Sequence, residues 1–145
     1  MLVSQILKTK GSDVVSTTAE ATINEAAVLM ANNNVGAVLV RGGDGGAVVG
    51  ILSERDVTRG LAKSGSAVGT ARVGTLMSGS IVHCSPSDTS DSLMDLMTHK
   101  RIRHLPVLAD GELVGMISIG DVVKARLSEL QSQAAALETY IAGTG

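Results

Sequence analysis

The 145-residue chain has almost no aromatic side chains: it contains one tyrosine, Tyr140, and neither tryptophan nor phenylalanine. Proteins that bind single-stranded nucleic acid stack the bases on aromatic rings. The formal net charge of −2 also argues against a broad basic surface for phosphates. We therefore expect no nucleic-acid partner, and any flat ring that this protein binds has to lie against aliphatic side chains.

Other absences exclude further classes of protein. The single cysteine, Cys84, cannot form an intramolecular disulfide, which fits a reducing cytoplasm, and no set of zinc ligands accompanies it. No apolar run approaches the roughly 18 residues that span a bilayer, so we expect no membrane partner. Neither a Ser-His-Asp or Cys-His arrangement nor a phosphate-binding P-loop can be assembled, so we expect no enzyme, no metal site and no catalytic cofactor.

The most informative feature that is present is an internal repeat. Residues 49–57 return as residues 114–122, and both Gly50 to Gly115 and Asp56 to Asp121 step 65 positions. Further upstream, residues 35–40 align with residues 102–107 at a step of 67. Repeats on this scale are supersecondary units that bury their apolar faces against one another. We therefore expect one body made of two half-domains, with its function between them.

Each half predicts the order helix, strand, hairpin, strand, helix. Thr22 and Glu25 form a capping-box pattern at the first helix, and Pro106 is expected at a strand edge or start. The expected helices cover residues 23–34, 56–63, 91–99 and the chain from 121 onward; the expected strands cover 35–40, 47–52, 104–108 and 113–118; the expected turns cover 41–46 and 108–111; and residues 64–70 are expected to be a polar linker.

The last helix carries an apolar stripe that runs well past the repeat. Its members alternate at spacings of four and three, which is close to the heptad pattern of a coiled coil. They are Val123, Leu127, Leu130, Ala134, Leu137 and Ile141. Two interpretations stay open: the stripe packs against its own domain, or it meets the same helix of a second chain.

Together, these motifs resemble a tandem pair of cystathionine-β-synthase (CBS) domains, often called a Bateman module. The resemblance rests on two apolar strands that end in Gly-apolar-apolar-Ser-x-x-Asp, each behind an apolar strand and a hairpin. It implies an α+β fold of two βαββα-type repeats related by a pseudo-twofold axis and packed through their sheets. The corresponding division is repeat 1 with the N-terminal segment at 1–63, a linker at 64–72, repeat 2 at 73–126 and a helical extension at 127–145.

The resemblance also implies a function. Members of the family bind adenine nucleotides in clefts between the repeats, commonly form homodimers, and regulate rather than catalyse. We expect AMP as the ligand, with ADP, ATP, NAD or S-adenosylmethionine as alternatives, and a separate regulated protein whose identity the sequence does not reveal. The alternative is a dimerising scaffold with empty clefts.

The two Ser-x-x-Asp segments are the expected ribose sites. A carboxylate can accept hydrogen bonds from both hydroxyls of a ribose, so Asp56 and Asp121 are the predicted anchors, with Ser53 and Ser118 beside them. The same pattern before a helix is also a capping box, which would occur for folding reasons alone.

Basic residues near these segments are the expected phosphate sites. By the resemblance, Arg103 and His104 lie on the second-half strand that faces a cleft, where the first half has Gly36 and Ala37, so we expect two unequal clefts. Arg55 and Lys10 are further candidates. The adenine pocket is expected from the resemblance to involve Val15, Val35, Ala37, Ile51, Ile81, Val82, Ile102 and Met116, with Thr9 and Ser78 as weaker candidates.

Overall fold

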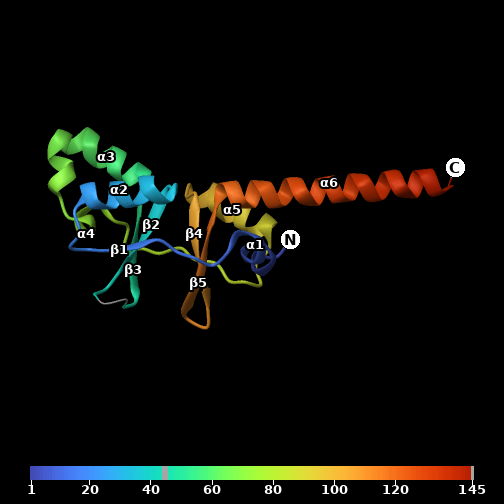
Figure 1. The fold of residues 1–145 in the computed structure, drawn as a ribbon, viewed down its shortest axis with the longest axis horizontal. Helices are drawn as coiled ribbons and strands as arrows, with labels where there is room; N and C mark the ends of the chain where they lie inside the picture. Colours follow the sequence, from blue (N-terminus) through green and yellow to red (C-terminus); the bar gives the residue numbers. More distant parts are fainter. Residues whose placement is uncertain (44–45, 145) are drawn as a thin grey trace. The chain divides into compact units, whose positions relative to one another are not determined.

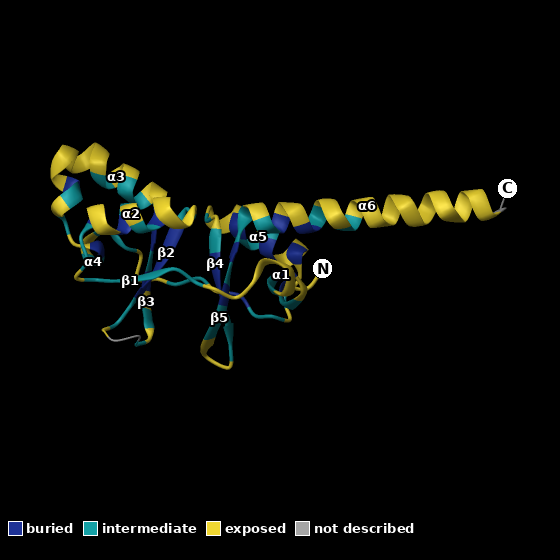
Figure 2. Ribbon diagram, viewed as in Figure 1, coloured by how far each residue is buried: buried dark blue, intermediate teal, exposed yellow. Residues whose placement is uncertain are grey.

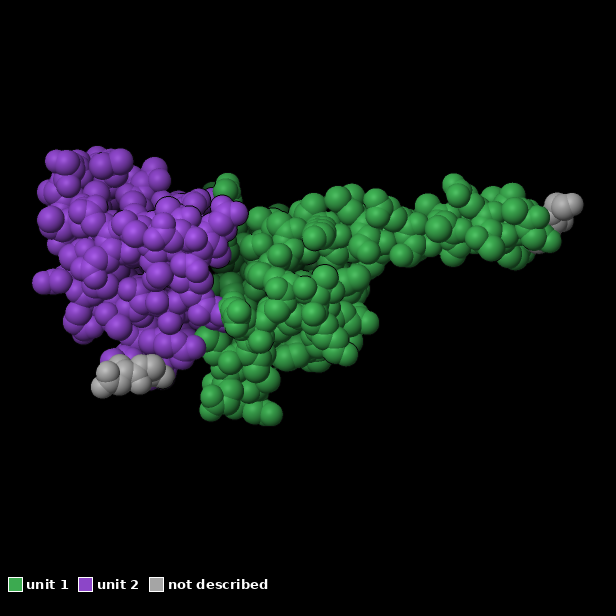
Figure 3. All heavy atoms as spheres, viewed as in Figure 1, with its two compact units in different colours: residues 1–13, 82–145 green, residues 14–81 purple. Residues whose placement is uncertain are grey.

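The computed structural model describes residues 1–43 and 46–144. The chain divides into two compact units, one made of residues 1–13 and 82–145 and the other of residues 14–81 (Figure 3). We call them the second-repeat unit and the first-repeat unit, after the repeat that each contains. The N-terminal segment, expected in repeat 1, thus belongs to the compact unit of repeat 2.

The first-repeat unit is built on a three-stranded sheet (Figure 1). Its central strand β2 runs parallel to β1 and antiparallel to β3. Apolar residues of α2 and of the sheet form its core together with Val68 and Val73. Along the chain its elements are β1 (Ser16–Thr18), α2 (Ile23–Asn33), β2 (Ala37–Arg41), β3 (Val48–Ser53), α3 (Glu54–Ser64), η1 (Gly65–Thr70) and α4 (Val73–Leu76).

The segment expected to be a polar linker is ordered instead. Residues 65–70 form the 3₁₀ helix η1, which packs against α3 and α2. Val68 is the reason, because this single apolar side chain is buried in the core of the unit. The hairpin expected at residues 41–46 includes residues 44–45, which lie outside the described part of the chain.

The second-repeat unit contains a two-stranded antiparallel sheet, α5 and the two terminal helices (Figure 1). Val3 and Ile6 of the N-terminal helix are buried in its core, which explains why residues 1–13 belong to this unit. We did not predict that helix from the sequence. Its elements are α1 (Val3–Lys10), α5 (Ser90–Lys100), β4 (His104–Ala109), β5 (Glu112–Ser118) and α6 (Ile119–Thr144).

The two units repeat the same local architecture with one strand reduced. Ser16–Thr18 pairs with β2 along three residues, whereas in the second-repeat unit only Cys84 bridges Val107 in the parallel sense. Pro106 lies within β4, and its carbonyl accepts from the N–H of Cys84. The N–H and C=O of one residue face the same side of a strand, so the position of the N–H that Pro106 lacks faces Cys84. Pro106 therefore removes no hydrogen bond to β5, as expected for an edge position.

The glycines that repeat at a step of 65 allow another segment to approach the strand. A Cβ at Gly50 would lie 2.5 Å from Met77 Sδ and 2.9 Å from the backbone oxygen of Ser78. A Cβ at Gly115 would meet only the side chain of Leu7, at 2.6 Å from Cδ2. Gly50 thus faces the backbone of Ser78, which cannot move aside easily. Gly115 faces only the flexible side chain of Leu7.

We therefore predict that Gly50→Ala destabilises the protein by about 2 kcal/mol, within the range for overpacking a core. Gly115→Ala is expected to cost clearly less, because Leu7 can change rotamer. The free energy of unfolding from urea titrations measures both effects. Gly79→Ala is the matched control, since a Cβ there meets nothing within 4 Å; equal losses in Gly50→Ala and Gly79→Ala would contradict the assignment.

Candidate functional site

Each unit carries one Ser-x-x-Asp segment at the junction between a strand and a helix. In the first-repeat unit, Asp56 Oδ2 accepts from the N–H and Oγ–H of Ser53 at 2.9 and 3.0 Å, and the N–H of Asp56 donates to Ser53 Oγ at 3.4 Å. In the second-repeat unit, Asp121 Oδ2 accepts from the N–H of Ser118 at 2.9 Å, and the N–H of Asp121 donates to Ser118 Oγ at 3.2 Å. Both segments are therefore capping boxes in the structure.

The capping contacts do not use up the carboxylates. An ionised carboxylate offers about four acceptor positions, and the capping contacts of both aspartates use Oδ2. Both side chains lie at an intermediate level of burial rather than in the core. The arrangement can therefore accept further donors from a bound molecule while the helix start stays capped.

Lys10 adds a positive charge to the junction of the second-repeat unit. It is the last residue of α1, and its Nζ donates to Asp121 Oδ2 and to the carbonyl oxygen of Met116, both at 2.6 Å. We expected Lys10 as a phosphate ligand and did not predict this ion pair. No local pattern could have revealed it, because the two residues are 111 positions apart.

The ion pair affects the ionisation of Asp121. Partial burial is the largest influence and by itself raises the pKa of the Asp121 carboxyl. The hydrogen bond and charge of Lys10 and the hydrogen bonds of Ser118 together outweigh it, so that pKa lies below its ordinary value. The carboxylate is therefore ionised throughout the neutral range, and both of its oxygens act only as acceptors there.

The backbone brings Arg103 and His104 to the same junction as Asp121. The carbonyl of Arg103 accepts from the N–H of Ile119 at 2.8 Å, and His104 pairs with Ser118 in the sheet. The exposed Arg103 side chain therefore starts beside the first turn of α6.

The equivalent contacts in the first-repeat unit involve small residues. There the carbonyl of Gly36 accepts from the N–H of Glu54 at 3.0 Å, and Ala37 pairs with Ser53. Arg55 lies in the first turn of α3 next to Asp56, and its side chain is exposed. The two junctions are thus alike in backbone and different in the charge of their side chains, while the predicted difference between two ligand clefts stays a prediction.

The predicted adenine-pocket residues are mostly half-buried. Of the eight, only Ala37 is fully buried, and Val15, Val35, Val82 and Ile102 pack at the borders of the two cores. Ile51 and Met116 lie on β3 and β5, the strands that lead into the junctions, while Ile81 ends the first-repeat unit rather than starting the second. Partial exposure is compatible with a ligand wall, and their contact with adenine stays a prediction.

The two weaker candidates lie beside the repeat to which we had not assigned them. Thr9 is an exposed residue of α1, which packs in the second-repeat unit. Ser78 exchanges two backbone hydrogen bonds with Ile51 of the first-repeat unit, at 2.9 and 3.0 Å. Each segment that precedes a repeat thus joins the unit of the other repeat.

Within residues 1–43 and 46–144, no three histidine, cysteine, aspartate or glutamate side chains are grouped as a metal ion would need. In the same part of the chain, none of the helices has the length and apolar character to cross a membrane. Cys84 is buried, and that burial, with the nearby charge of Asp88, raises the pKa of its thiol to about 12, so that it stays a thiol at neutral pH.

Comparison with known proteins agrees with this arrangement. The CBS domain family matches twice, at residues 3–63 and 73–128. A mitochondrial CBS domain-containing protein of Arabidopsis thaliana, CBSX3, is 35% identical over 97% of this chain and 72% of its own length. The CBS domain-containing protein YhcV of Bacillus subtilis is 31% identical over 86% of this chain and 87% of its own.

Solved structures show the same fold. A CBS-domain-containing protein of Agrobacterium tumefaciens is 43% identical with a TM-score of 0.84, over 86% of this chain and 92% of that one. The CBS domain pair of protein MJ0100, in complex with 5′-methylthioadenosine and S-adenosyl-L-methionine, has a TM-score of 0.77 at 20% identity, over 89% of this chain and 98% of that one. The duplicated fold thus defines a tandem-repeat α+β module.

This chain belongs to the CBS-domain family and contains two CBS domains. The predicted family and fold class are confirmed. The expected location in the cytoplasm stays a prediction, since one relative is a mitochondrial protein.

The ion pair of Lys10 yields a prediction about pH. Because the pKa of Asp121 is lowered in the folded protein, its ionisation contributes stability above the ordinary aspartate pKa, and this contribution is lost as the pH falls through the lowered value. Lys10→Met is expected to raise the pKa of Asp121, so that the loss occurs at higher pH. A carboxyl NMR titration of Asp121 measures the change.

Lys8→Met is the control for that titration. Lys8 lies on the same helix and is exposed, and the variant removes the same charge. We expect the Asp121 titration in Lys8→Met to match that of the unchanged protein. If Lys10→Met leaves the pKa of Asp121 unchanged, the ion pair does not form in solution.

Proposed function

We propose that this protein is a regulatory module that binds an adenosyl ligand, AMP foremost and ADP, ATP, NAD or S-adenosylmethionine as alternatives, and signals to a separate protein. In this proposal Asp56 and Asp121 accept the ribose hydroxyls, and Ser53 and Ser118 hold the two carboxylates in place. The module changes the activity of its partner by binding that ligand better in one state than in another. It carries out no reaction itself.

The observation that carries the proposal is the duplicated junction. A capping box does not by itself require a carboxylate at its third helical position, since Ser92 fills that position at the start of α5. Both repeats instead use a half-buried carboxylate at the same place after the same strand. A carboxylate is the group suited to accept from two neighbouring hydroxyls of one sugar.

The adenosyl class is the first to test because of the likeness in fold. The MJ0100 domain pair, whose fold this chain shares, is described with two adenosyl compounds bound. The aliphatic residues around the junctions suit such a ligand in a chain with no phenylalanine or tryptophan, since a purine can lie between Val, Ile and Met side chains.

The two junctions should differ in what they bind. We propose that Lys10, Arg103 and His104 make the Asp121 junction the phosphate-binding one, with Arg55 in a similar role beside Asp56. A guanidinium offers two parallel donors that match phosphate oxygens. The ammonium of Lys10 already lies 2.6 Å from the Asp121 carboxylate, so a ligand that binds there brings its phosphates close to a positive charge.

The first test is binding to protein stripped of ligand by unfolding and refolding. Calorimetric titration with adenosine, AMP, ATP, NAD and S-adenosylmethionine identifies the ligand. Asp121→Ala is then expected to weaken binding at its junction by about 3 kcal/mol, or roughly a hundredfold, for two charge-assisted hydrogen bonds. Asp56→Ala is expected to do the same at the other junction.

The control separates binding from folding. Ser92→Ala removes part of a capping box at the start of α5, whose hydrogen bonds join Ser92 to Thr89, and should leave affinity unchanged. Unaltered titrations of both aspartate variants would reject the ribose assignment. Failure of the unchanged protein to bind any member of the panel would favour the ligand-free scaffold.

A second test concerns the phosphate group. Arg103→Ala is expected to weaken ATP or AMP binding about tenfold, as loss of one charged hydrogen bond would, and to leave adenosine binding unchanged. Arg101→Ala, two positions earlier on the exposed end of α5, is the matched charge control. Equal losses for adenosine and ATP in Arg103→Ala would show that Arg103 acts on the fold and not on phosphate.

A further inference from the structure

The outer half of α6 has no cover from its own unit. Figure 2 shows the helix in yellow over most of its length, and every described residue from 131 to 143 is exposed. Eleven large apolar residues are exposed in the described part of the chain, and six of them lie on this one helix. Monomeric proteins rarely expose so concentrated an apolar surface unless it binds something.

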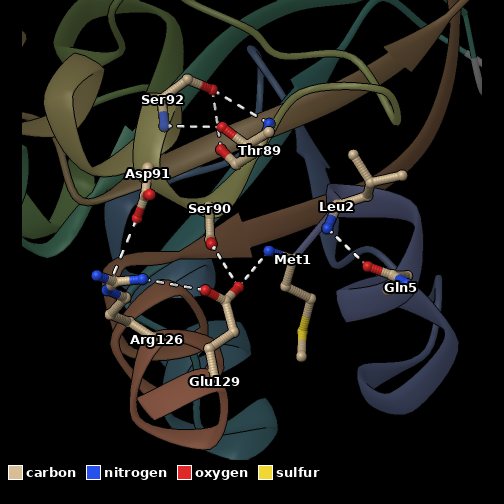
Figure 4. A network of polar contacts seen from close by, with 9 residues as sticks. All are labelled: Met1, Leu2, Gln5, Thr89, Ser90, Asp91, Ser92, Arg126 and Glu129. Carbon is tan, nitrogen blue, oxygen red and sulfur yellow. Dashed lines mark hydrogen bonds and ion pairs between the residues drawn. The ribbon is translucent and has the colours of Figure 1, made fainter. Parts of the chain in front are cut away.

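The base of the same helix is firmly anchored. Val122 and Ala125 are buried in the core of the second-repeat unit. On the next turn, Glu129 accepts from the Ser90 hydroxyl at 3.2 Å and from Arg126 at 3.2 Å, and also contacts the amino group of Met1 (Figure 4). The fixed base orders the first turns, while a helix of about a dozen further residues in water is only marginally stable without a partner.

The exposed apolar residues form one stripe that fits a coiled-coil seam. Its core positions are Val123, Leu127, Leu130, Ala134, Leu137 and Ile141, and Leu127 and Leu137 are 55% and 60% exposed. The spacing predicted two possible partners, its own domain or a second chain. The structure excludes the first for residues 131–143, because its own unit leaves this part of the helix uncovered.

The sizes of the side chains favour a second copy in the antiparallel direction. In a parallel pair, Ala134 would face Ala134 and leave a gap between larger neighbours, which is unfavourable in a packed seam. In an antiparallel pair centred on residue 132, each small residue faces a large one. The layers are then Val123 with Ile141, Leu127 with Leu137, and Leu130 with Ala134, each occurring twice.

The charges favour the same direction. When the core residues of the stripe are the a and d positions of a heptad, the residue after each d is an e position beside the seam. In an antiparallel pair, the e positions of the two helices meet each other. Here these positions hold Lys124, Gln131 and Glu138. The antiparallel register therefore places Lys124 of each copy beside Glu138 of the other and Gln131 beside its twin, whereas a parallel pair leaves both charged residues facing glutamine or solvent.

We propose that α6 is a self-association helix: two copies of this chain pair through the stripe from Val123 to Ile141, running antiparallel, with Lys124 of each copy opposite Glu138 of the other. The occupant of the exposed surface is thus a second copy of the chain. This inference is independent of the ligand proposed above.

Sedimentation equilibrium of the full chain tests the surface. Leu137→Glu places a charge in the seam twice per dimer, and we expect it to weaken association by at least about a hundredfold. Ala136→Glu adds the same charge on the adjacent outward position and should leave association unchanged. A monomeric native chain at tens of micromolar, or an association step that Leu137→Glu leaves intact, would overturn the proposal.

A charge exchange tests the direction. Lys124→Glu and Glu138→Lys are each expected to weaken the dimer about fivefold, and the double variant is expected to restore it, because the two pairs re-form with their charges exchanged. In a parallel pair the two residues do not meet. Absence of recovery in the double variant would then reject the antiparallel register.

Distances between spin labels provide a readout that does not depend on affinity. In a Cys84→Ala background, labels on Gln133→Cys should lie close together, since residue 133 is near the centre. Labels on Ala142→Cys should be separated by about 30 Å, because each lies some 20 residues from its twin along the paired helices. Short distances at both positions would show a parallel pair and contradict the proposal.

Discussion

The reciprocal bond between a serine and an aspartate three residues later is the contact on which the two junctions depend. It ends a strand and starts a helix at the same point, satisfying N–H groups that the first turn would otherwise leave unpaired. It also fixes the orientation of each carboxylate before any ligand arrives. A pre-set acceptor loses little freedom on binding, so the fold itself prepares the proposed site.

The sequence was informative wherever the two repeats agree. Gly50 and Gly115, with the apolar runs around them, correctly predicted β3 and β5, and the Ser-x-x-Asp segments predicted α3 and α6, which begin two residues before the expected positions 56 and 121. These strands and helix starts could be predicted because hydrophobic periodicity and helix capping act within a few residues of the chain. The family and the α+β class followed from the same duplicated residues.

The sequence was less informative where structure depends on distant contacts. Helix α1 is short, and its burial of Val3 and Ile6 depends on a core that forms from residues beyond position 82. Likewise Val68 orders η1 by reaching a core made by α2 and the sheet. The ion pair of Lys10 and Asp121 is of the same kind. Propensity alone describes a short segment poorly when tertiary contacts decide its state.

The two units show how one backbone can offer two different sites. Gly36 and Arg103 accept equivalent backbone hydrogen bonds at the two junctions, so a substitution there changes the charge beside the aspartate without altering the ladder. The shared backbone supplies the geometry, and the exposed side chains that differ between the units set the chemistry. Residues such as Arg103 can therefore differ between repeats at little cost in stability, as surface substitutions generally do.

The proposed ligand site and the proposed dimer seam share one helix, α6. Asp121 lies in the first turn of α6, and the seam starts at Val123 and continues along the same helix. A ligand that holds Asp121 therefore also holds the base of the helix that presents the seam. Ligand binding and self-association would then be linked, and by reciprocity dimer formation would change ligand affinity by the same factor.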